Sequence, residues 1–402
     1  MERTKVIPAE RESSRAVGVF APLFPPAFRG GGPIRSLDAL VASAPLRWAP
    51  LVLTTNRDLG DSQPMPVAAD TWISRGSAAI WYVSARSIRM LMTGMKALRR
   101  ERPILLYFNS FFSPTASILP IVLGWLGFWN RPVRVLAPRG EFGPGALSRR
   151  PLKKKAYILF FRCLGLHRHL IWHATAPHEI EDIRRHWGAD AKIVFRQNDT
   201  LLPKTPAQPT IPSAVPRAVF LGRIVEHKGL EVLLNALIEV PGPFQLHIYG
   251  AEEDDGYVAS CKEIASKVAA DISVAFHGVV PAEEVRSVLS GFDLLLMPTA
   301  GENFGHVIAE ALSVSCPVFA TPWTPWSDIL NDGGGRVIED RTPRAWADLI
   351  RELQLSTVEE RLELRLSAGR VYEAWASTPK SPHLFDLVMA DQNLDPRIGR
   401  RR

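Results

Sequence analysis

The chain has 402 residues, of which 46% are hydrophobic, and its formal net charge is +7. Such a chain is expected to be soluble and long enough for two domains, each with its own hydrophobic core. Its three cysteines, Cys163, Cys261 and Cys316, lack the paired spacing of a zinc site, which excludes that class of metal protein and favours a reduced, cytosolic chain.

The N-terminal half is predicted to alternate strands with helices. Residues 1–15 are charged and lack the apolar core of a secretory signal, so we expect a frayed leader. Strand-like runs follow at 17–20, 104–108 and 133–137. The longest uncharged stretch, 113–130, contains two prolines, and its apolar core is shorter than the roughly 20 residues of a membrane span. We expect a buried or interfacial helix there, with a transmembrane helix as the alternative.

The segment 149–170 combines positive charge with apolar and aromatic residues. Three lysines at 153–155 precede Tyr157, Phe160 and Phe161. Such a mixture could bind nucleic acid, but no nucleic-acid fold signature accompanies it. An anionic membrane surface explains the apolar residues better, and a solvated basic face above a core helix is the remaining alternative. The arginines at 397–402 are expected to form a disordered tail.

The two domains are predicted to meet at a proline-rich segment. The sequence LPKTPAQPTIPSAVP at 202–216 has no periodic apolar spacing, which suits an interdomain linker. Strand-like runs at 218–221, 245–249 and 293–297 alternate with helical patterns, so the class is α/β and the sheets should be parallel. The predicted organisation is an N-terminal domain at 16–203, a linker at 204–216, a C-terminal domain at 217–375, and a C-terminal helix with a basic tail at 376–402.

Two cations follow the first strand of the C-terminal domain. Gly222 and Arg223 end the strand at 218–221, and Lys228 precedes a helical pattern at 230–238. In open α/β sheets ligands bind beyond the carboxyl ends of the strands. An arginine can hold a diphosphate by forked hydrogen bonds and a lysine as a point charge. Either residue alone would be interpreted as a surface cation.

Two carboxylates flank a second junction of the same kind, in the sequence ENFGHVIAE at 302–310. An apolar run at 294–297 predicts a buried parallel strand, and Gly305 opens a helix. Helical spacing places Glu310 opposite the apolar face of that helix, while Glu302 stays in the loop at its N-terminus. This terminus favours anions, so a ligand with both phosphate and hydroxyl groups would suit the site. The alternative is a loop glutamate and a solvated helix glutamate.

These motifs resemble the signature of the retaining glycosyltransferase family 4 on the GT-B fold. GRIVEHKG at 222–229 matches its R-x4-K pair, and DLLLMPTAGENFGHVIAEAL at 293–312 matches its E-x7-E motif. The resemblance covers about residues 16–375. PPAFRGGGPIRSL at 25–37 is similar to the family's glycine-rich first loop, and APRGEFGPGAL at 137–147 to an acceptor-side loop of members that build surface polysaccharides. Many members carry Pro-Asn-Gly where this chain has Arg-Gln-Asn-Asp at 196–199, which puts the turn there in question.

The resemblance implies two Rossmann-like domains whose parallel sheets face across a cleft. It implies transfer of a sugar from a nucleotide diphosphate sugar to an acceptor hydroxyl, with retention at the anomeric carbon. Arg223 and Lys228 would stabilise the departing diphosphate, and Glu302 would bind the transferred sugar as the third catalytic residue. The remaining donor-binding candidates are Gly222, Asn303, Phe304, Gly305, Glu310 (toward the ribose), Gly30, Gly31 and Gly32, and the acceptor-side candidates are Arg139 and Glu141. A flexible surface loop is the alternative for the three consecutive glycines.

No cofactor or metal is expected, because the two cations would do what Mg²⁺ does elsewhere. Asp254 and Asp255 resemble a metal motif but are expected in a loop near the nucleotide. The implied partners are the nucleotide-sugar donor, a lipid-linked or oligosaccharide acceptor, and an anionic membrane surface, but not nucleic acid. The expected setting is bacterial cell-surface polysaccharide biosynthesis (exopolysaccharide, capsule or lipopolysaccharide), by a cytoplasmic protein peripheral to the inner face of the cell membrane. The alternatives are a sugar-nucleotide epimerase on the same fold and a non-catalytic nucleotide-sugar-binding protein.

Overall fold

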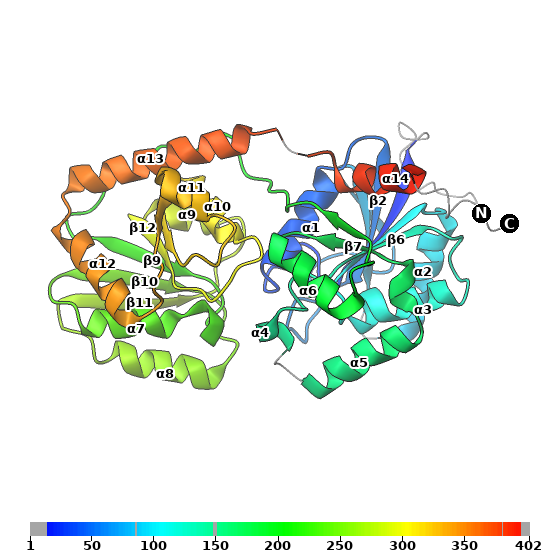
Figure 1. Ribbon diagram of the computed structural model, residues 1–402, viewed down its shortest axis with the longest axis horizontal. Coiled ribbons are helices and arrows are strands. Elements are labelled where there is room, and N and C mark those ends of the chain that lie inside the picture. The colour runs from blue at the N-terminus through cyan, green and yellow to red at the C-terminus, as the bar shows by residue number, and fades with distance from the viewer. Residues whose placement is uncertain (1–13, 85–86, 148–150, 380, 395–402) are drawn as a thin grey trace. The chain divides into compact units, whose positions relative to one another are not determined.

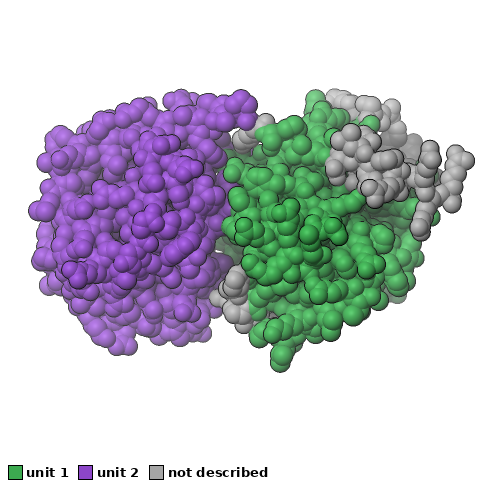
Figure 2. All heavy atoms as spheres, in the orientation of Figure 1, with its two compact units in different colours: residues 1–200, 380–402 green, residues 201–379 purple. Residues whose placement is uncertain are grey.

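The protein is described from a computed structural model, which covers residues 14–84, 87–147, 151–379 and 381–394 (Figure 1). The chain divides into two compact units, unit 1 with Met1–Thr200 and Lys380–Arg402, and unit 2 with Leu201–Pro379 (Figure 2). The predicted arginine tail lies outside the described residues. So does the predicted leader, except for Ser14 and Arg15, where the first strand begins.

Unit 1 is built on an eight-stranded sheet with the strand order β3-β4-β2-β1-β5-β6-β7-β8. All pairs are parallel except β3 with β4, so the predicted parallel sheet carries one antiparallel edge strand. The strands are β1 (Arg15–Phe20), β2 (Trp48–Thr55), β3 (Trp72–Arg75), β4 (Ala78–Val83), β5 (Leu105–Asn109), β6 (Val133–Ala137), β7 (Ile171–Ala174) and β8 (Ile193–Phe195).

Helices cover both faces of this sheet, which is why central strands such as β4 and β5 are continuously apolar and buried. One face packs on α1 (Gly32–Ala42) and α14 (Leu384–Leu394). The other packs on α2 (Ile88–Arg100), α3 (Leu119–Trp125), α5 (Pro151–Cys163) and α6 (Pro177–Trp187), and a short helix α4 (Pro144–Leu147) precedes α5. The two layers of helices in unit 1 are visible in Figure 1.

Unit 2 has a six-stranded parallel sheet with the order β11-β10-β9-β12-β13-β14. Its strands are β9 (Arg217–Leu221), β10 (Phe244–Tyr249), β11 (Ile272–Gly278), β12 (Leu294–Met297), β13 (Val318–Ala320) and β14 (Gly335–Val337). One face packs on α7 (Leu230–Ile238), α8 (Asp255–Ala265) and α12 (Pro343–Leu355); the other packs on α9 (Val285–Ser290), α10 (His306–Leu312), α11 (Ser327–Ile329) and α13 (Val358–Ser377). All strands predicted from the sequence overlap observed strands.

The proline-rich segment is not a free linker between the units, because the structure places it within unit 2. The backbone of Ala207 exchanges hydrogen bonds with the loop after α10, at 2.9 Å to Ser313 and 2.7 Å from Ser315. Arg365 of α13 is 1% exposed and donates to the Thr210 hydroxyl at 2.9 Å. The Arg365 side chain, from a helix far along the chain, therefore helps to fix a segment whose composition alone predicts flexibility.

The C-terminal helix α14 belongs to unit 1 and does not form a separate element. Asp386 accepts hydrogen bonds from Arg47 and from the Trp48 indole, each at 2.8 Å, beside the start of β2. The chain therefore passes between the units twice, after Thr200 and after Pro379. The predicted domain limits at 203 and 375 lie a few residues from these points.

The uncharged stretch 113–130 forms a wide helical turn at Pro114–Ile118 that continues into α3. Ile121 is buried in the core of unit 1, whereas Trp125 and Leu126 at the end of the helix are 50% and 66% exposed. Among the described residues, every helix is too short or too polar to span a bilayer. The stretch is therefore partly buried, with an apolar end in solvent.

Candidate functional site

The loop after β9 approaches the loop after β12 through a glycine. Gly229 has a φ of +76°, and a Cβ there would overlap the carbonyl oxygen of Pro298. Next to this contact Ala300 N donates to His227 O at 2.7 Å. A residue with a side chain could adopt neither this backbone conformation nor this separation without strain. The sequence Lys228-Gly229 therefore brings the two motif loops of unit 2 into direct contact.

Lys228 and Glu302 form an ion pair across this contact. The Lys228 ammonium donates to a carboxylate oxygen of Glu302, which lies 74 residues further along the chain. The two side chains are only 16% and 12% exposed. Glu302 N in turn donates to Trp323 O at 2.9 Å, which holds the carboxylate-bearing loop against the loop after β13. Two of the three residues predicted for catalysis therefore contact each other where both side chains are largely shielded from water.

Arg223 lies nearby in sequence but in a more open environment. Its guanidinium donates to Glu253 at 3.2 Å, and the side chain is 40% exposed. Glu253 belongs to the loop that leads into α8, and the next residue, Asp254, caps that helix by accepting from Tyr257 N at 3.1 Å. Asp254 and Asp255 were predicted to lie in a loop, but they form the start of α8, directly after the residue that contacts the predicted diphosphate-binding cation. Within the described residues no group of three or more His, Cys, Asp or Glu side chains could hold a metal ion.

Helix α10 begins at His306, directly after Gly305 with its φ of +74°. Glu310 is 7% exposed, so the alternative interpretation as a solvated surface glutamate is wrong. The side chain of Phe304 is buried, and its carbonyl accepts from the Trp326 indole, which fixes the backbone of the 302–305 loop. Trp326 lies in the segment ATPWTPWSD at 320–328, which the family resemblance includes, but the sequence did not indicate this contact.

A second residue that the sequence did not reveal is Arg341, which joins the two motif loops. Its Nε donates to Pro298 O at 2.7 Å and its Nη2 to Glu226 O at 3.2 Å. Each loop thus contributes one carbonyl oxygen to the same guanidinium. Because both acceptors are backbone atoms, nothing in the side-chain pattern of the loops indicates this contact.

In unit 1 the glycine-rich loop precedes α1. Gly31 has a φ of +68° and lies at the start of the helix. The buried carboxylate of Asp58 accepts from Phe28 N at 2.9 Å and from Arg29 N at 3.2 Å. Gly30 packs against Leu23, whereas no atom of the described residues, apart from the chain neighbours, lies within 4 Å of where a Cβ of Gly31 would be. The loop is therefore anchored at its beginning, and Gly31 has open space beside it.

The two acceptor-side candidates, Arg139 and Glu141, form hydrogen bonds with different parts of unit 1. Arg139 donates to the Asn109 side chain at 2.7 Å, to the Tyr107 hydroxyl at 2.9 Å, and to the amide oxygen of Asn198. Glu141 holds the loop after β5, because its carboxylate accepts from the Ser110 hydroxyl at 2.7 Å and from two backbone N–H groups. Burial raises the pKa of Glu141, although these hydrogen bonds oppose the shift.

A buried polar network that sequence reasoning missed supports Arg139. The Tyr107 hydroxyl is hydrogen-bonded to His173 Nδ1 at 3.0 Å, and burial together with the nearby Arg139 charge lowers the pKa of His173 to about 3. Glu179, 1% exposed, accepts from Gly140 N and from Thr175 N. The loop 137–143 is therefore held by neutral and charged groups from β5, β7 and α6.

The segment 196–199, which departs from the family's Pro-Asn-Gly, forms a buried ion pair. Arg196 contacts Asp199 at 2.7 Å with both side chains 5% exposed, and Arg196 Nε donates to Pro382 O at 2.9 Å. Asp199 also accepts from the Ser43 hydroxyl at 3.1 Å. A salt bridge thus fixes the chain just before it leaves unit 1.

Helix α5 presents only some of the residues predicted to meet a membrane. Phe161 is buried against Phe111 and Trp187, and Lys154 places its ammonium over the Phe112 ring at 5.1 Å. Tyr157 is half-buried and also packs on Phe111. Lys153, Lys155 and Phe160 are exposed, as predicted, and Leu152 and Leu159 add apolar surface, with 81%, 61% and 45% exposure for Leu152, Leu159 and Phe160. The apolar run at 157–161 has no clear helical periodicity, so the sequence does not predict which face of α5 is buried, and tertiary packing determines it.

Residues 203–368, within unit 2, match the family model described as glycosyl transferases group 1. The chain is 27% identical over 213 residues to a D-inositol 3-phosphate glycosyltransferase of Xylanimonas cellulosilytica, covering 49% of this chain and 50% of that protein. The chain spans about half the length of the curated relatives it matches.

Two solved structures resemble the whole chain. Sucrose-phosphate synthase from Thermosynechococcus elongatus has a TM-score of 0.66 at 16% identity, over 96% of this chain and 99% of that one. HepE of Anabaena, in complex with UDP and glucose, has a TM-score of 0.64 at 14% identity, over 96% of this chain and 100% of that one. The chain therefore has the GT-B fold, and the predicted fold class of two Rossmann-like domains is confirmed.

Gly229 and Gly278 provide a matched pair for testing the loop contact. Both have a φ of +76°, but no atom lies within 4 Å of a Cβ at Gly278. Gly278→Ala should cost about 1–2 kcal/mol through backbone strain alone. Gly229→Ala should cost roughly 1–3 kcal/mol more, because the methyl group also overlaps Pro298. The free energy of unfolding of unit 2 in urea measures both. Equal losses for the two variants would mean that the loop contact is not close.

Proposed function

We propose that the protein transfers a sugar from a nucleotide diphosphate sugar to an acceptor hydroxyl. The observation that carries this proposal is the Lys228–Glu302 pair, at the carboxyl ends of β9 and β12, with Arg223 in the same loop as Lys228, within the segment that matches the group 1 model. Cations and a carboxylate in one place suit a ligand that has both phosphate and hydroxyl groups. The presence of UDP and glucose in the similar HepE structure supports such a donor.

The charges in unit 2 suggest how the leaving group is stabilised. Departure of the nucleotide diphosphate develops negative charge on its β-phosphate, and Arg223 and Lys228 can place positive charge there. Removing one such preorganised donor from an enzyme typically costs about 3 kcal/mol of barrier. In the structure these cations contact Glu253 and Glu302. A bound phosphate would accept hydrogen bonds from the exposed Arg223 guanidinium in place of Glu253. It would also contact the Lys228 ammonium while Glu302 remains bound to it.

The carboxylates have separate roles in this proposal. Glu302 accepts hydrogen bonds from hydroxyls of the transferred sugar, and its contact with the Lys228 ammonium orients the carboxylate. Glu310 receives the ribose, and the backbone of Asn303 and Gly305 contacts the phosphates. Retention at the anomeric carbon follows from the resemblance to family 4.

The acceptor is proposed to be a lipid-linked or oligosaccharide hydroxyl in bacterial cell-surface polysaccharide synthesis, because the loop 137–147 resembles that of such enzymes. The D-inositol 3-phosphate glycosyltransferases among the relatives make inositol phosphate a second candidate. A sugar-nucleotide epimerase would isomerise the donor without an acceptor, and a binding protein would leave it unchanged. A donor panel with and without acceptors, read by release of nucleotide diphosphate, separates these functions.

Glu302→Gln is expected to lower turnover at least about tenfold, some 1.4 kcal/mol of barrier, because it removes the carboxylate charge while keeping the side-chain volume. Initial rates with the donor and acceptor identified by the panel, on protein shown to be folded, measure the loss. Glu263→Gln is the matched control, since Glu263 forms an ion pair with Lys267 at 71% exposure. Near-native turnover of Glu302→Gln would contradict the proposed site.

Activity is expected to survive excess EDTA, because Arg223 and Lys228 supply the positive charge that a divalent cation would otherwise bring to the phosphates. Initial rates before and after chelation, followed by addition of Mg²⁺ or Mn²⁺, measure this. A complete loss that either ion reverses would show that the two cations do not suffice.

We also propose that unit 1 attaches reversibly to anionic membranes through α5. Leu152, Leu159 and Phe160 offer apolar surface, and Lys153 and Lys155 face solvent beside them. Each such lysine near an anionic surface is worth about 1 kcal/mol, and shallow insertion of apolar side chains adds to this. An interfacial helix of this kind needs no membrane span.

Co-sedimentation with phosphatidylserine-containing vesicles tests this attachment. Binding should fall at high salt because screening weakens the headgroup attraction. Lys153→Gln together with Lys155→Gln should weaken binding at least about tenfold, by the loss of two headgroup contacts. The control is Lys262→Gln together with Lys267→Gln, two exposed lysines in unit 2. Equal sedimentation with neutral and anionic vesicles would show that the basic face of α5 is only solvated.

A further inference from the structure

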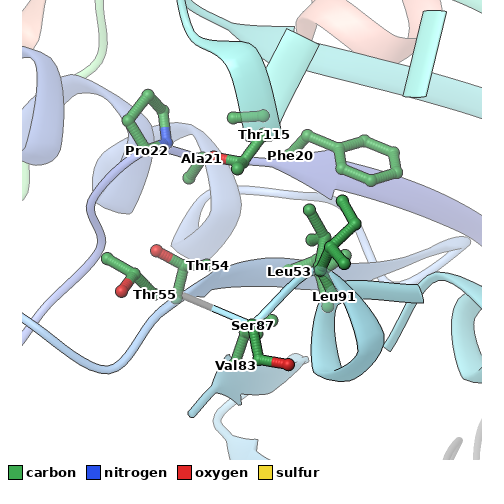
Figure 3. A pocket seen from close by; sticks show the side chains of 12 residues that line it. Phe20, Ala21, Pro22, Leu53, Thr54, Thr55, Val83, Ser87, Leu91 and Thr115 are labelled. Carbon is green, nitrogen blue, oxygen red and sulfur yellow. The ribbon is translucent and has the colours of Figure 1, made fainter. Parts of the chain in front are cut away.

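A pocket of about 350 Å³ lies in unit 1, where β1, β2 and β4 end. Figure 3 shows side chains from these strand ends gathered with side chains of α2 and of the turn after β5. Phe20, Leu53, Val83 and Leu91 supply much of the apolar lining. None of the lining residues was a candidate in the sequence, because they are ordinary apolar and hydroxyl residues without a motif.

The described residues that line the pocket are uncharged. Their polar side chains are the hydroxyls of Thr54, Thr55, Ser87 and Thr115. Thr54 is 3% exposed, and its hydroxyl has no hydrogen-bond partner in the described part of the chain. A buried hydroxyl without a partner is unfavourable, so a group that supplies one would be stabilised there. Pockets that bind small molecules are typically of this size, mostly apolar, with a few polar groups.

The pocket is open at a rim that includes an exposed apolar residue. Ile88, the first residue of α2, is 61% exposed and lines the pocket, and the neighbouring Ser87 is also exposed. The space behind this rim is therefore open to solvent and is not a sealed void. It would hold on the order of ten water molecules or a similar number of ligand atoms.

We infer that this pocket binds an uncharged, largely apolar group of the acceptor, such as an aliphatic chain or ring beside the reacting hydroxyl. This inference rests on the proposed function, because it assigns the pocket to the acceptor of that transfer. The carboxyl ends of parallel strands are where ligands bind in open α/β sheets. None of the described lining residues is a cation, so a phosphate would leave its charge among their apolar side chains, and neither the donor diphosphate nor an inositol phosphate suits them.

The probe for a binding test is 1-octanol, titrated by ligand-observed NMR. Ser87 suits substitution because it lies exposed at the rim and its side chain makes no capping hydrogen bond to α2. Ser87→Trp should fill the mouth of the pocket and weaken octanol binding at least about tenfold. Ser87→Ala removes the same hydroxyl without adding volume and should bind octanol as the native protein does. A dissociation constant of about 1 mM is expected for a probe this small.

Two further titrations separate this inference from the proposed function. UDP should bind the native protein and both Ser87 variants equally, because its proposed contacts are in unit 2. D-inositol 3-phosphate should not displace octanol. Octanol should inhibit transfer competitively with the acceptor and not with the donor.

The inference is overturned if octanol fails to bind, binds Ser87→Trp as well as Ser87→Ala, or is displaced by inositol 3-phosphate. Normal UDP binding in those cases would leave the donor site intact, so only the assignment of the pocket would fail. If UDP binds no form of the protein while octanol binding depends on Ser87 as expected, the proposed function fails and the apolar pocket remains.

Discussion

The close approach of two loops at Gly229 is the constraint on which the candidate site of unit 2 depends. The strands β9 and β12 are neighbours in a parallel sheet, so their carboxyl ends already lie side by side. Adjacency alone would leave the loops separated by their side chains. Because Gly229 has none, the backbone of one loop contacts Pro298 of the other, and Arg341 donates to a carbonyl of each. Lys228 thereby reaches Glu302 across 74 residues of sequence.

The two cations of this site differ in how free they are to exchange partners. Lys228 is 16% exposed and paired with a carboxylate that is 12% exposed, so breaking the pair would leave a poorly solvated charge. Arg223 is 40% exposed and its pair with Glu253, at 3.2 Å, is partly screened by water. A phosphate can therefore displace Glu253 at little cost, whereas it must approach Lys228 with Glu302 still present. This asymmetry favours a ligand that offers phosphate to one cation and hydroxyl groups to the carboxylate beside the other.

Much of this arrangement follows from the sequence, because buried parallel strands are continuous apolar runs and their following loops share one edge of the sheet. The partners of the charged residues do not follow from it. Glu141 was predicted to contact a ligand, and in the structure its carboxylate holds the loop at Ser110. This contact becomes apparent only when both loops are placed in three dimensions. The buried face of α5 could not be predicted either, because its apolar residues follow one another without a helical period. In the structure Phe161 is on the buried face, where it packs against Phe111 and Trp187. The proline-rich segment is less free than its composition indicates, because composition reflects only local flexibility. Arg365, on a distant helix, donates a hydrogen bond to Thr210 of this segment.

The two units differ in the charge of the residues at their strand ends, and this difference suits the proposed transfer to an acceptor other than water. A site that stabilises a departing diphosphate must carry fixed positive charge, and unit 2 places Arg223 and Lys228 where its strands end. The corresponding strand ends of unit 1 border a pocket whose described lining residues are uncharged, while charged residues of that unit, such as Arg139 and Arg196, are held by hydrogen bonds within it. In the transfer that we propose, such a lining would orient an acceptor through its apolar surface and would offer few partners to water, the competing nucleophile. Selection of the acceptor over water would then need no additional charge, and the positive charge of unit 2 would act on the leaving group.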